Sequence, residues 1–312
     1  MRVVAFLFAA VAYCVAPAAR AADPLTTLPY RIAYDGWITV EATVNGQGPY
    51  DFIIDTGATL TLVFSNVTEK QDFPLSPGPP KRILGLNSEQ SVDLVRIGDI
   101  AVGDEVFADH LGVVLTDWST PENTPGGIIG LDFLSQYLVV FDAQARTMSL
   151  YDADIDKPRF PRDWSSAPMK RRQFKEEIGA LFVVEGRIQS QQFDFILDLG
   201  ATTTLINFPA FRRLIGGIRI NESGGSPRNA SRISDVSGDT ERARLVRMPR
   251  MRLRRARWAQ PILLVFNATV FEELGVANAP FGLFGVDLLR DRSFALDFKN
   301  ERIFISRTSV KS

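Results

Sequence analysis

Apolar residues in this chain fall in short runs that alternate with polar positions or consist of β-branched side chains. Alternation with a period of two is typical of strands that bury one face. Clusters rich in Gly, Pro and Asn, such as 45–49 and 76–80, separate the runs and indicate turns. The pattern predicts an all-β fold. Strands are predicted at Ile38–Val44, Phe52–Ile54, Val92–Ile97, Leu111–Leu115 and Met148–Tyr151, and short helices at 131–137, 206–215 and 286–291.

One phrase occurs twice in the chain. Residues 50–63 read YDFIIDTGATLTLV, and residues 193–206 read FDFILDLGATTTLI. Further matches follow in the same order, because 94–107 is similar to 245–258 and 128–134 is similar to 283–289. Matches in the same order along the chain indicate an internal duplication of one fold unit.

The duplication predicts two similar lobes. The N-terminal lobe spans 30–151 and the C-terminal lobe spans 178–306. The stretch between them, 152–177, carries three prolines among charged residues and is predicted to be a linker.

Residues 1–21 have the pattern of a secretory signal peptide. Arg2 precedes an apolar stretch, and Ala19-Arg20-Ala21 is a small-x-small cleavage site. The apolar stretch is shorter than the roughly 20 residues of a membrane span. The only cysteine, Cys14, lies within it, so the mature chain would have no disulfide. We expect an exported protein, periplasmic or secreted, with no membrane attachment after cleavage.

Composition narrows the classes of function. The chain is 46% hydrophobic, which suits a globular fold, and its net charge of −1 gives no reason to expect a nucleic-acid or membrane partner. Residues 242–257 contain eight arginines. They alternate with Met248, Met251 and Leu253, which predicts the basic outer face of a sheet; docking to an anionic surface or another protein is the alternative. His110 is the only histidine, and a surface or strand-end position is expected for it.

The repeated phrase places an aspartate, Asp55 or Asp198, at the end of an apolar strand in each copy. If the copies pack about an approximate two-fold axis, the two carboxyl groups meet and hold one proton between them, because like charges so close do not both ionise readily. The ionised member can take a proton from water while the other donates to a carbonyl oxygen. Such a pair hydrolyses an amide without a metal or cofactor. The residues expected to support the two turns are Thr56, Gly57, Ala58, Thr59, Gly200, Ala201 and Thr202.

Two other pairs of acids repeat between the copies. Asp132 matches Asp287, and Asp142 matches Asp297. A metal site is one interpretation of these pairs. We expect structural roles in caps and turns, since only Asp55 and Asp198 precede Gly-Ala-Thr.

At these residues the chain resembles the aspartic protease superfamily, and within it the bacterial retropepsin-like group. The resemblance rests on Asp-Thr-Gly-Ala-Thr at 55–59, on Asp-Leu-Gly-Ala-Thr at 198–202, and on Ile-Ile-Gly-Leu-Asp-Phe-Leu at 128–134 with its partner at 283–289. It implies that each lobe is a retropepsin-like β-barrel. It also implies that a peptide or protein substrate lies extended in the cleft between the lobes.

The resemblance further implies a hairpin flap that closes over the substrate. Gly85, Leu86 and Asn87 are the flap candidates in the first half, and the longer stretch 221–238 takes the corresponding place in the second, with a tip expected to be mobile.

One residue departs from the family pattern. The family usually has Thr or Ser after the catalytic aspartate, and its hydroxyl helps to lock the two turns together. Thr56 fits this pattern and Leu199 does not, so one side of the lock is expected to be missing. We expect a monomeric aspartic endopeptidase with Asp55 and Asp198 as its catalytic pair. The alternatives are a non-catalytic or weakly active peptide-binding protein, and an enzyme that processes one partner protein or itself.

Overall fold

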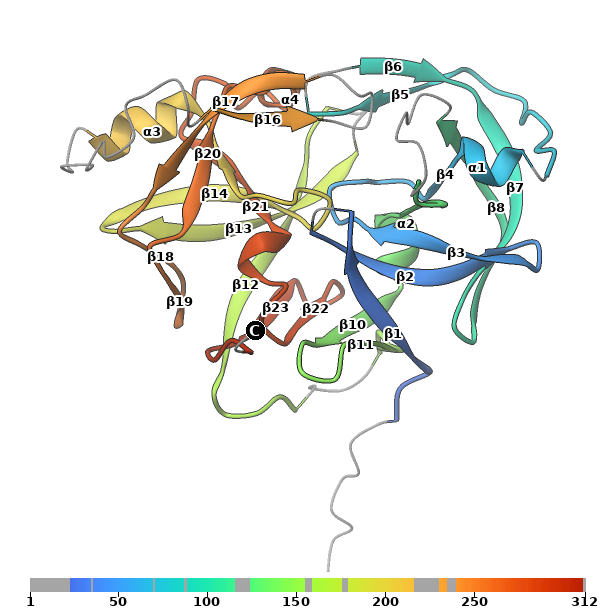
Figure 1. Ribbon diagram of the computed structural model, residues 1–312, viewed down its shortest axis with the longest axis horizontal. Helices are drawn as coiled ribbons and strands as arrows, with labels where there is room; N and C mark the ends of the chain where they lie inside the picture. The colour runs from blue at the N-terminus through green and yellow to red at the C-terminus, as the bar shows by residue number, and fades with distance from the viewer. Residues whose placement is uncertain are drawn as a thin grey trace, which may run out of the picture.

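The computed structural model describes residues 23–310, except 35, 70, 87–88, 116–123, 155–158, 176–178, 216–229 and 235–239. These residues are mostly strand, with a few short helices and a closed six-stranded barrel. The all-β prediction is therefore confirmed. Figure 1 shows the earlier half of the chain, in blue to green, beside the later half, in yellow to red.

The first half contains two short helices, α1 (Ser65–Thr68) and α2 (Leu131–Leu134). The predicted run Val92–Ile97 is interrupted at Asp93, because Val92 ends a separate hairpin and Leu94 begins a strand of the main sheet. The strands of this half are β1 (Thr26–Ala33), β2 (Trp37–Val44), β3 (Gln47–Ile54), β4 (Leu62–Phe64), β5 (Lys81–Leu84), β6 (Glu89–Val92), β7 (Leu94–Val102), β8 (Glu105–Leu115), β9 (Gly127–Ile129), β10 (Tyr137–Asp142) and β11 (Thr147–Asp152).

The second half contains α3 (Phe208–Ile215), α4 (Thr269–Glu273) and the 3-10 turn η2 (Val286–Leu288). The helices predicted near 131, 206 and 286 are thus present, while α1 and α4 were not predicted. The strands of this half are β12 (Trp164–Gln173), β13 (Ala180–Ile188), β14 (Gln191–Asp198), β15 (Leu205–Ile206), β16 (Ala230–Ser234), β17 (Thr240–Arg247), β18 (Arg250–Leu253), β19 (Ala256–Ala259), β20 (Ile262–Val265), β21 (Phe281–Gly285), β22 (Phe294–Asp297) and β23 (Arg302–Ser306).

The predicted linker contains a strand. Within 152–177, β12 pairs with β23 over 164–168 and with β13 over 169–173. Pro168, which has no N–H to donate, lies where the pairing passes from one partner strand to the other. The linker prediction relied on prolines and charges, which a strand that changes its partner at a proline also tolerates.

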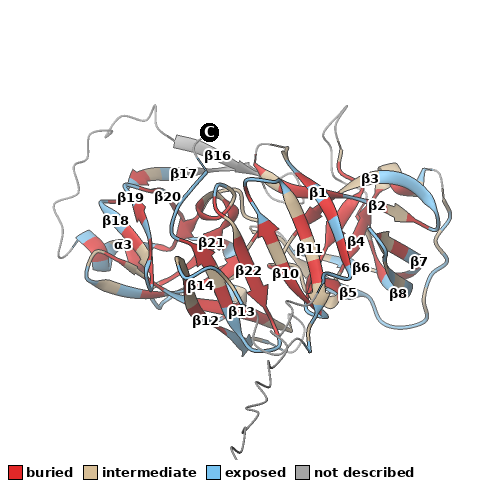
Figure 2. Ribbon diagram, turned by 90° about the horizontal axis from the view of Figure 1, so that it is seen from below, coloured by how far each residue is buried: buried red, intermediate tan, exposed pale blue. Residues whose placement is uncertain are grey.

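The two halves share one sheet and one core. β10 pairs antiparallel with β22, from Leu138 opposite Asp297 to Phe141 opposite Phe294, and the rings of Phe141 and Phe294 stack 4.4 Å apart. A single cluster of buried apolar residues extends through both halves. Figure 2 shows this buried material along the middle of the molecule. Burial of apolar area on this scale is the main favourable contribution to folding, and it fixes one half against the other.

The arginine-rich segment lies on strands, as its alternation predicts. Met251 and Leu253 of β18 are buried, while Arg250 and Arg257 are exposed. Among the helices in the described part of the chain, none has the length and apolar composition that crossing a membrane requires.

Candidate active site

Each predicted catalytic aspartate lies at the carboxyl end of a central strand. β3 leads into Asp55 and runs parallel to β9, and the Asp55 N–H donates to the Ile129 carbonyl at 3.0 Å. β14 ends at Asp198 and runs parallel to β21, with Asp198 opposite Gly285. The apolar runs before both aspartates are therefore buried strands that hold the carboxyl groups on rigid supports.

The structure brings the two carboxyl groups together. The side chains of Asp55 and Asp198 are hydrogen-bonded to each other, although the residues come from different halves. Asp55 Oδ1 also accepts the backbone N–H groups of Gly57 at 2.6 Å and of Gly200 at 3.2 Å. Asp198 Oδ1 accepts the N–H of Ala201 at 3.0 Å. Both side chains remain partly exposed to solvent.

The two carboxyl groups have unequal surroundings. Burial raises the pKa of Asp198 well above its ordinary value, and the nearby charge of Asp55 raises it further. Burial also raises the pKa of Asp55, but N–H groups from Gly57, Ala58 and Gly200 stabilise its ionised form and oppose that rise. The pair therefore favours one proton held on Asp198 and a negative charge on Asp55.

The glycines of the two turns are required by the closeness of the aspartates. A Cβ added at Gly57 would lie 2.7 Å from Asp198 Oδ1, and one added at Gly200 would overlap the Asp55 carboxyl group. Neither glycine has the positive φ that would reserve the position for glycine on conformational grounds. The sequence predicts these glycines as residues that support the turns, and the structure adds a steric reason for them.

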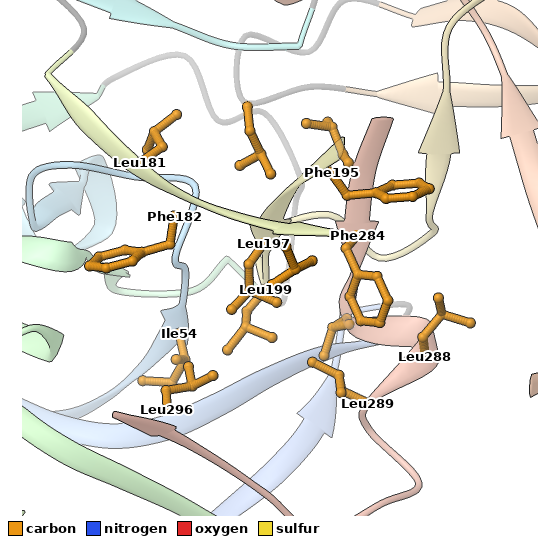
Figure 3. Close-up of a cluster of buried hydrophobic side chains, with 14 of the residues drawn as sticks. Ile54, Leu181, Phe182, Phe195, Leu197, Leu199, Phe284, Leu288, Leu289 and Leu296 are labelled. Atoms are coloured by element: carbon orange, nitrogen blue, oxygen red, sulfur yellow. The ribbon is translucent and has the colours of Figure 1, made fainter. Parts of the chain in front are cut away.

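The hydroxyl of Thr56 joins the two turns. It donates to the Leu197 carbonyl at 2.7 Å and accepts the N–H of Leu199 at 3.1 Å, and Thr56 is fully buried. Leu199, at the matching position of the second turn, has no hydroxyl to return. Its side chain is 0% exposed, and Figure 3 shows it in a cluster of apolar side chains that also includes Ile54 and Leu296. The lock is therefore made from one side.

Residues 40–133 match a family model described as Aspartyl protease, which belongs to the retropepsin-like clan. This segment of the chain is similar to an aspartyl protease family. The match includes Asp55 and its turn and ends before Asp198, so it bears on the first half only. No curated protein matches the chain.

A second layer of hydrogen bonds holds each of the two aspartate turns in place. The hydroxyl of Thr61 donates to Asp132 Oδ1 at 2.6 Å and accepts the N–H of Gly130 at 3.0 Å. In the second half, Thr204 donates to Asp287 at 2.7 Å and accepts the N–H of Gly285. The repeated Asp132 and Asp287 thus have structural roles. Sequence reasoning missed the threonines, although their recurrence in both copies was a usable signal.

The remaining acid pair also serves turns. Asp142 Oδ1 accepts the N–H groups of Gln144 and Ala145, and Asp297 Oδ1 accepts that of Asn300. The part of the chain that the structure describes holds no group of three or more His, Cys, Asp or Glu residues that could bind a metal ion.

Two aromatic side chains from elsewhere in the chain contact the backbone of the two repeated phrases. Trp37 of β2 donates its indole N–H to the Gly200 carbonyl at 2.5 Å, so a first-half side chain supports the second-half turn.

His110 was expected at the surface or at a strand end, and this prediction was wrong. The ring is only 4% exposed within β8, lies 3.0 Å from the Thr61 carbonyl and packs on Phe107. The aromatic neighbour and the carbonyl make this buried place suitable for a polar ring.

Two of the predicted flap residues, Gly85 and Leu86, directly follow β5 in the β5–β6 hairpin. This hairpin forms a two-stranded sheet of its own, and Figure 1 shows it reaching from the first half towards α4 and β16. Gly85 and Leu86 are partly buried, and the Leu86 carbonyl accepts the N–H of Val270 at 3.1 Å. Asn87 and most of 221–238 lie outside the described residues.

Charged side chains connect the hairpin to the second half. Arg82 of β5 donates to both carboxylate oxygens of Glu89, at 2.5 and 2.6 Å, and to Glu273 of α4 at 3.3 Å. Lys175 donates to the same Glu273 at 3.0 Å, and this contact lowers the pKa of Glu273. Glu273 thus joins the hairpin to the strand end of β12.

Removing this connection should loosen the hairpin. We expect Glu273→Gln to raise the hydrogen-exchange rates of amides in 81–92 by about two- to fivefold, because exposed ion pairs contribute modestly. Glu272→Gln, one residue away and without these contacts, is the matched control. Hydrogen–deuterium exchange read by mass spectrometry measures both variants. Equal exchange in the two variants would show that Glu273 does not restrain the hairpin.

Proposed function

We propose that this protein is an exported endopeptidase that hydrolyses peptide bonds with a water molecule activated between Asp55 and Asp198. The hydrogen-bonded contact of these two carboxyl groups carries the proposal. Their unequal surroundings support it, since one ionised and one protonated carboxyl group are what acid–base catalysis by a pair requires.

In the proposed reaction, water gives a proton to Asp55 and its oxygen attacks the carbonyl carbon, while Asp198 donates its proton to the carbonyl oxygen. The resulting tetrahedral diol then collapses. One hydroxyl proton returns to Asp198, and Asp55 passes its proton to the leaving nitrogen. The N–H groups of Gly57 and Gly200, which point at Asp55, favour its ionised form at the start of each cycle.

We further propose that the substrate is a peptide or protein segment lying extended between the halves, with the β5–β6 hairpin over it. Extended peptides bind through their backbone groups, which suits a site bounded by strands. The proposal includes a monomeric enzyme released into the periplasm or medium by cleavage after residue 21, and it needs no cofactor.

The test is peptide cleavage. The mature protein, incubated with a mixed peptide library from acid to neutral pH, is expected to cut internal peptide bonds, and a pepstatin-type inhibitor is expected to block the cuts. Mass spectrometry of the products identifies the sites. Absence of cleavage across this pH range would overturn the proposal.

The one-sided lock at Leu199 favours a second candidate, a peptide-binding protein that has lost turnover. A protein of this kind would keep the peptide-binding cleft. This candidate function therefore predicts that peptides bind tightly and remain intact at every pH. An enzyme that processes one partner protein or itself is a third candidate, and it predicts cleavage of few library members. The library experiment separates these outcomes.

A further inference from the structure

A cavity of about 550 Å³ lies beside the catalytic turn of Asp55. Thr59 of that turn forms part of its wall, and the other walls come from both halves. This volume is within the range of sites that bind a small molecule or a side chain. The remaining lining residues are Leu131, Asp132, Ser135, Gln136, Ala153, Arg171, Gly179, Ala180, Phe182, Phe298 and Lys299.

The cavity has an apolar floor and two cations. Phe182 and Phe298 are buried, and their rings lie 5.0 Å apart. Arg171 and Lys299 are exposed and carry the positive charge. Such a combination suits a ligand with an aliphatic stem and a negatively charged head.

The available charge is concentrated on Arg171. The carboxylate of Asp132 is already engaged, because it accepts the N–H and hydroxyl of Thr61. Lys299 is paired with Asp154. No ion pair of Arg171 is found within the described ranges, so its guanidinium can serve an incoming carboxylate.

The matching place beside the other catalytic turn is built differently. In the first half, Ile32 takes the place that Arg171 has in the second. Arg171 of β12 pairs with Phe182 of β13, and Ile32 of β1 pairs in the same way with Ile38 of β2. The repeat places Arg290 where the cavity has Ser135, and the Arg290 guanidinium lies against Gly36, close to Thr202.

A long side chain therefore occupies one flank of the pair, while a serine leaves the other flank open. On the occupied flank, the apolar Ile32 takes the position of Arg171, and the neutral Gln144 takes the position of Lys299.

We infer that this cavity is a specificity subsite that takes a glutamate or aspartate side chain of the substrate and holds its carboxylate with Arg171. The inference rests on the proposed peptidase function and deepens it. The substrate class is a peptide with an acidic residue near the scissile bond. The apolar stem of this acidic side chain would cover Phe182 and Phe298, and its carboxylate would reach the guanidinium of Arg171.

Binding can be separated from cleavage with the Asp55→Asn variant. Short peptides that carry Glu, Gln or Lys at one position at a time are titrated into this variant and followed by fluorescence anisotropy. At one position, Glu is expected to bind about tenfold more tightly than Gln, as for a charged hydrogen-bonded pair. Adding Arg171→Glu is expected to reverse the order, so that Lys binds best there.

The matched control is Arg254→Glu, an exposed arginine in the turn between β18 and β19. It is expected to leave the preference unchanged. Equal affinity for Glu and Gln at every position, or a Glu preference that survives Arg171→Glu, would overturn the subsite.

Cleavage by the unmutated protein is measured on the same peptides. Glu-selective binding without cleavage contradicts the peptidase and leaves the subsite standing. Cleavage without Glu preference contradicts only the subsite.

Discussion

Replacing Asp55 with asparagine is expected to lower kcat for peptide hydrolysis by about a thousandfold, with a much smaller change in KM. Asparagine cannot accept the proton from water, and general acid–base groups contribute roughly 10²- to 10⁴-fold. Asp198→Asn is expected to lower kcat similarly, because its amide cannot pass a proton to the carbonyl oxygen. Steady-state kinetics on a peptide cut by the unmutated protein measures both effects.

Stability provides the control for these variants. The pKa of Asp198 is raised by burial, so stability from this group is full below its ordinary pKa and declines as the pH rises through the folded-state pKa. Asparagine resembles the protonated form, and Asp198→Asn should be at least as stable as the unmutated protein at neutral pH. A folded variant that keeps more than about a tenth of its activity would remove the aspartate from the mechanism.

Thr56→Val is expected to destabilise the fold by about 2–4 kcal/mol, because it removes two buried hydrogen bonds at once. The Leu197 carbonyl and the Leu199 N–H would both lose their partner in a fully buried place. The side chain of Leu199 has no hydroxyl that could replace either of these hydrogen bonds. Valine keeps the size of threonine, so the change tests hydrogen bonding more than packing. Urea denaturation measures the free energy of unfolding.

Thr202→Val is the matched control for this substitution. Thr202 is the partly exposed threonine of the second turn, and its replacement is expected to cost less than about 0.5 kcal/mol. If both variants lose equal stability, the Thr56 hydroxyl does not lock the turns.

The local pattern of the sequence predicted the strands that carry the aspartates. The apolar runs before Asp55 and Asp198 are buried strands, and the alternation around Met251 and Leu253 is seen in the burial of β18. These features depend on neighbouring residues, which a periodicity of two captures. The internal duplication and its domain boundaries stay predictions.

Long-range contacts were harder to predict. The indole of Trp37 reaches Gly200, and Glu273 joins Arg82 to Lys175, only because the halves pack in one particular way. Nothing local to these residues indicates a partner so distant in the chain. His110 was misjudged for the same reason, since its burial depends on β8 lying over the Thr61 loop.

The pH dependence of kcat/KM for peptide hydrolysis tests the central claim most directly. A pair with one shared proton predicts a bell-shaped profile. The rate should fall at acid pH as Asp55 takes up a proton, and again towards alkaline pH as Asp198 loses its own. Because burial and the charge of Asp55 raise the pKa of Asp198, the alkaline limb should lie well above the ordinary range of aspartate. A rate that stays level or keeps rising into the alkaline range would contradict catalysis by these two aspartates.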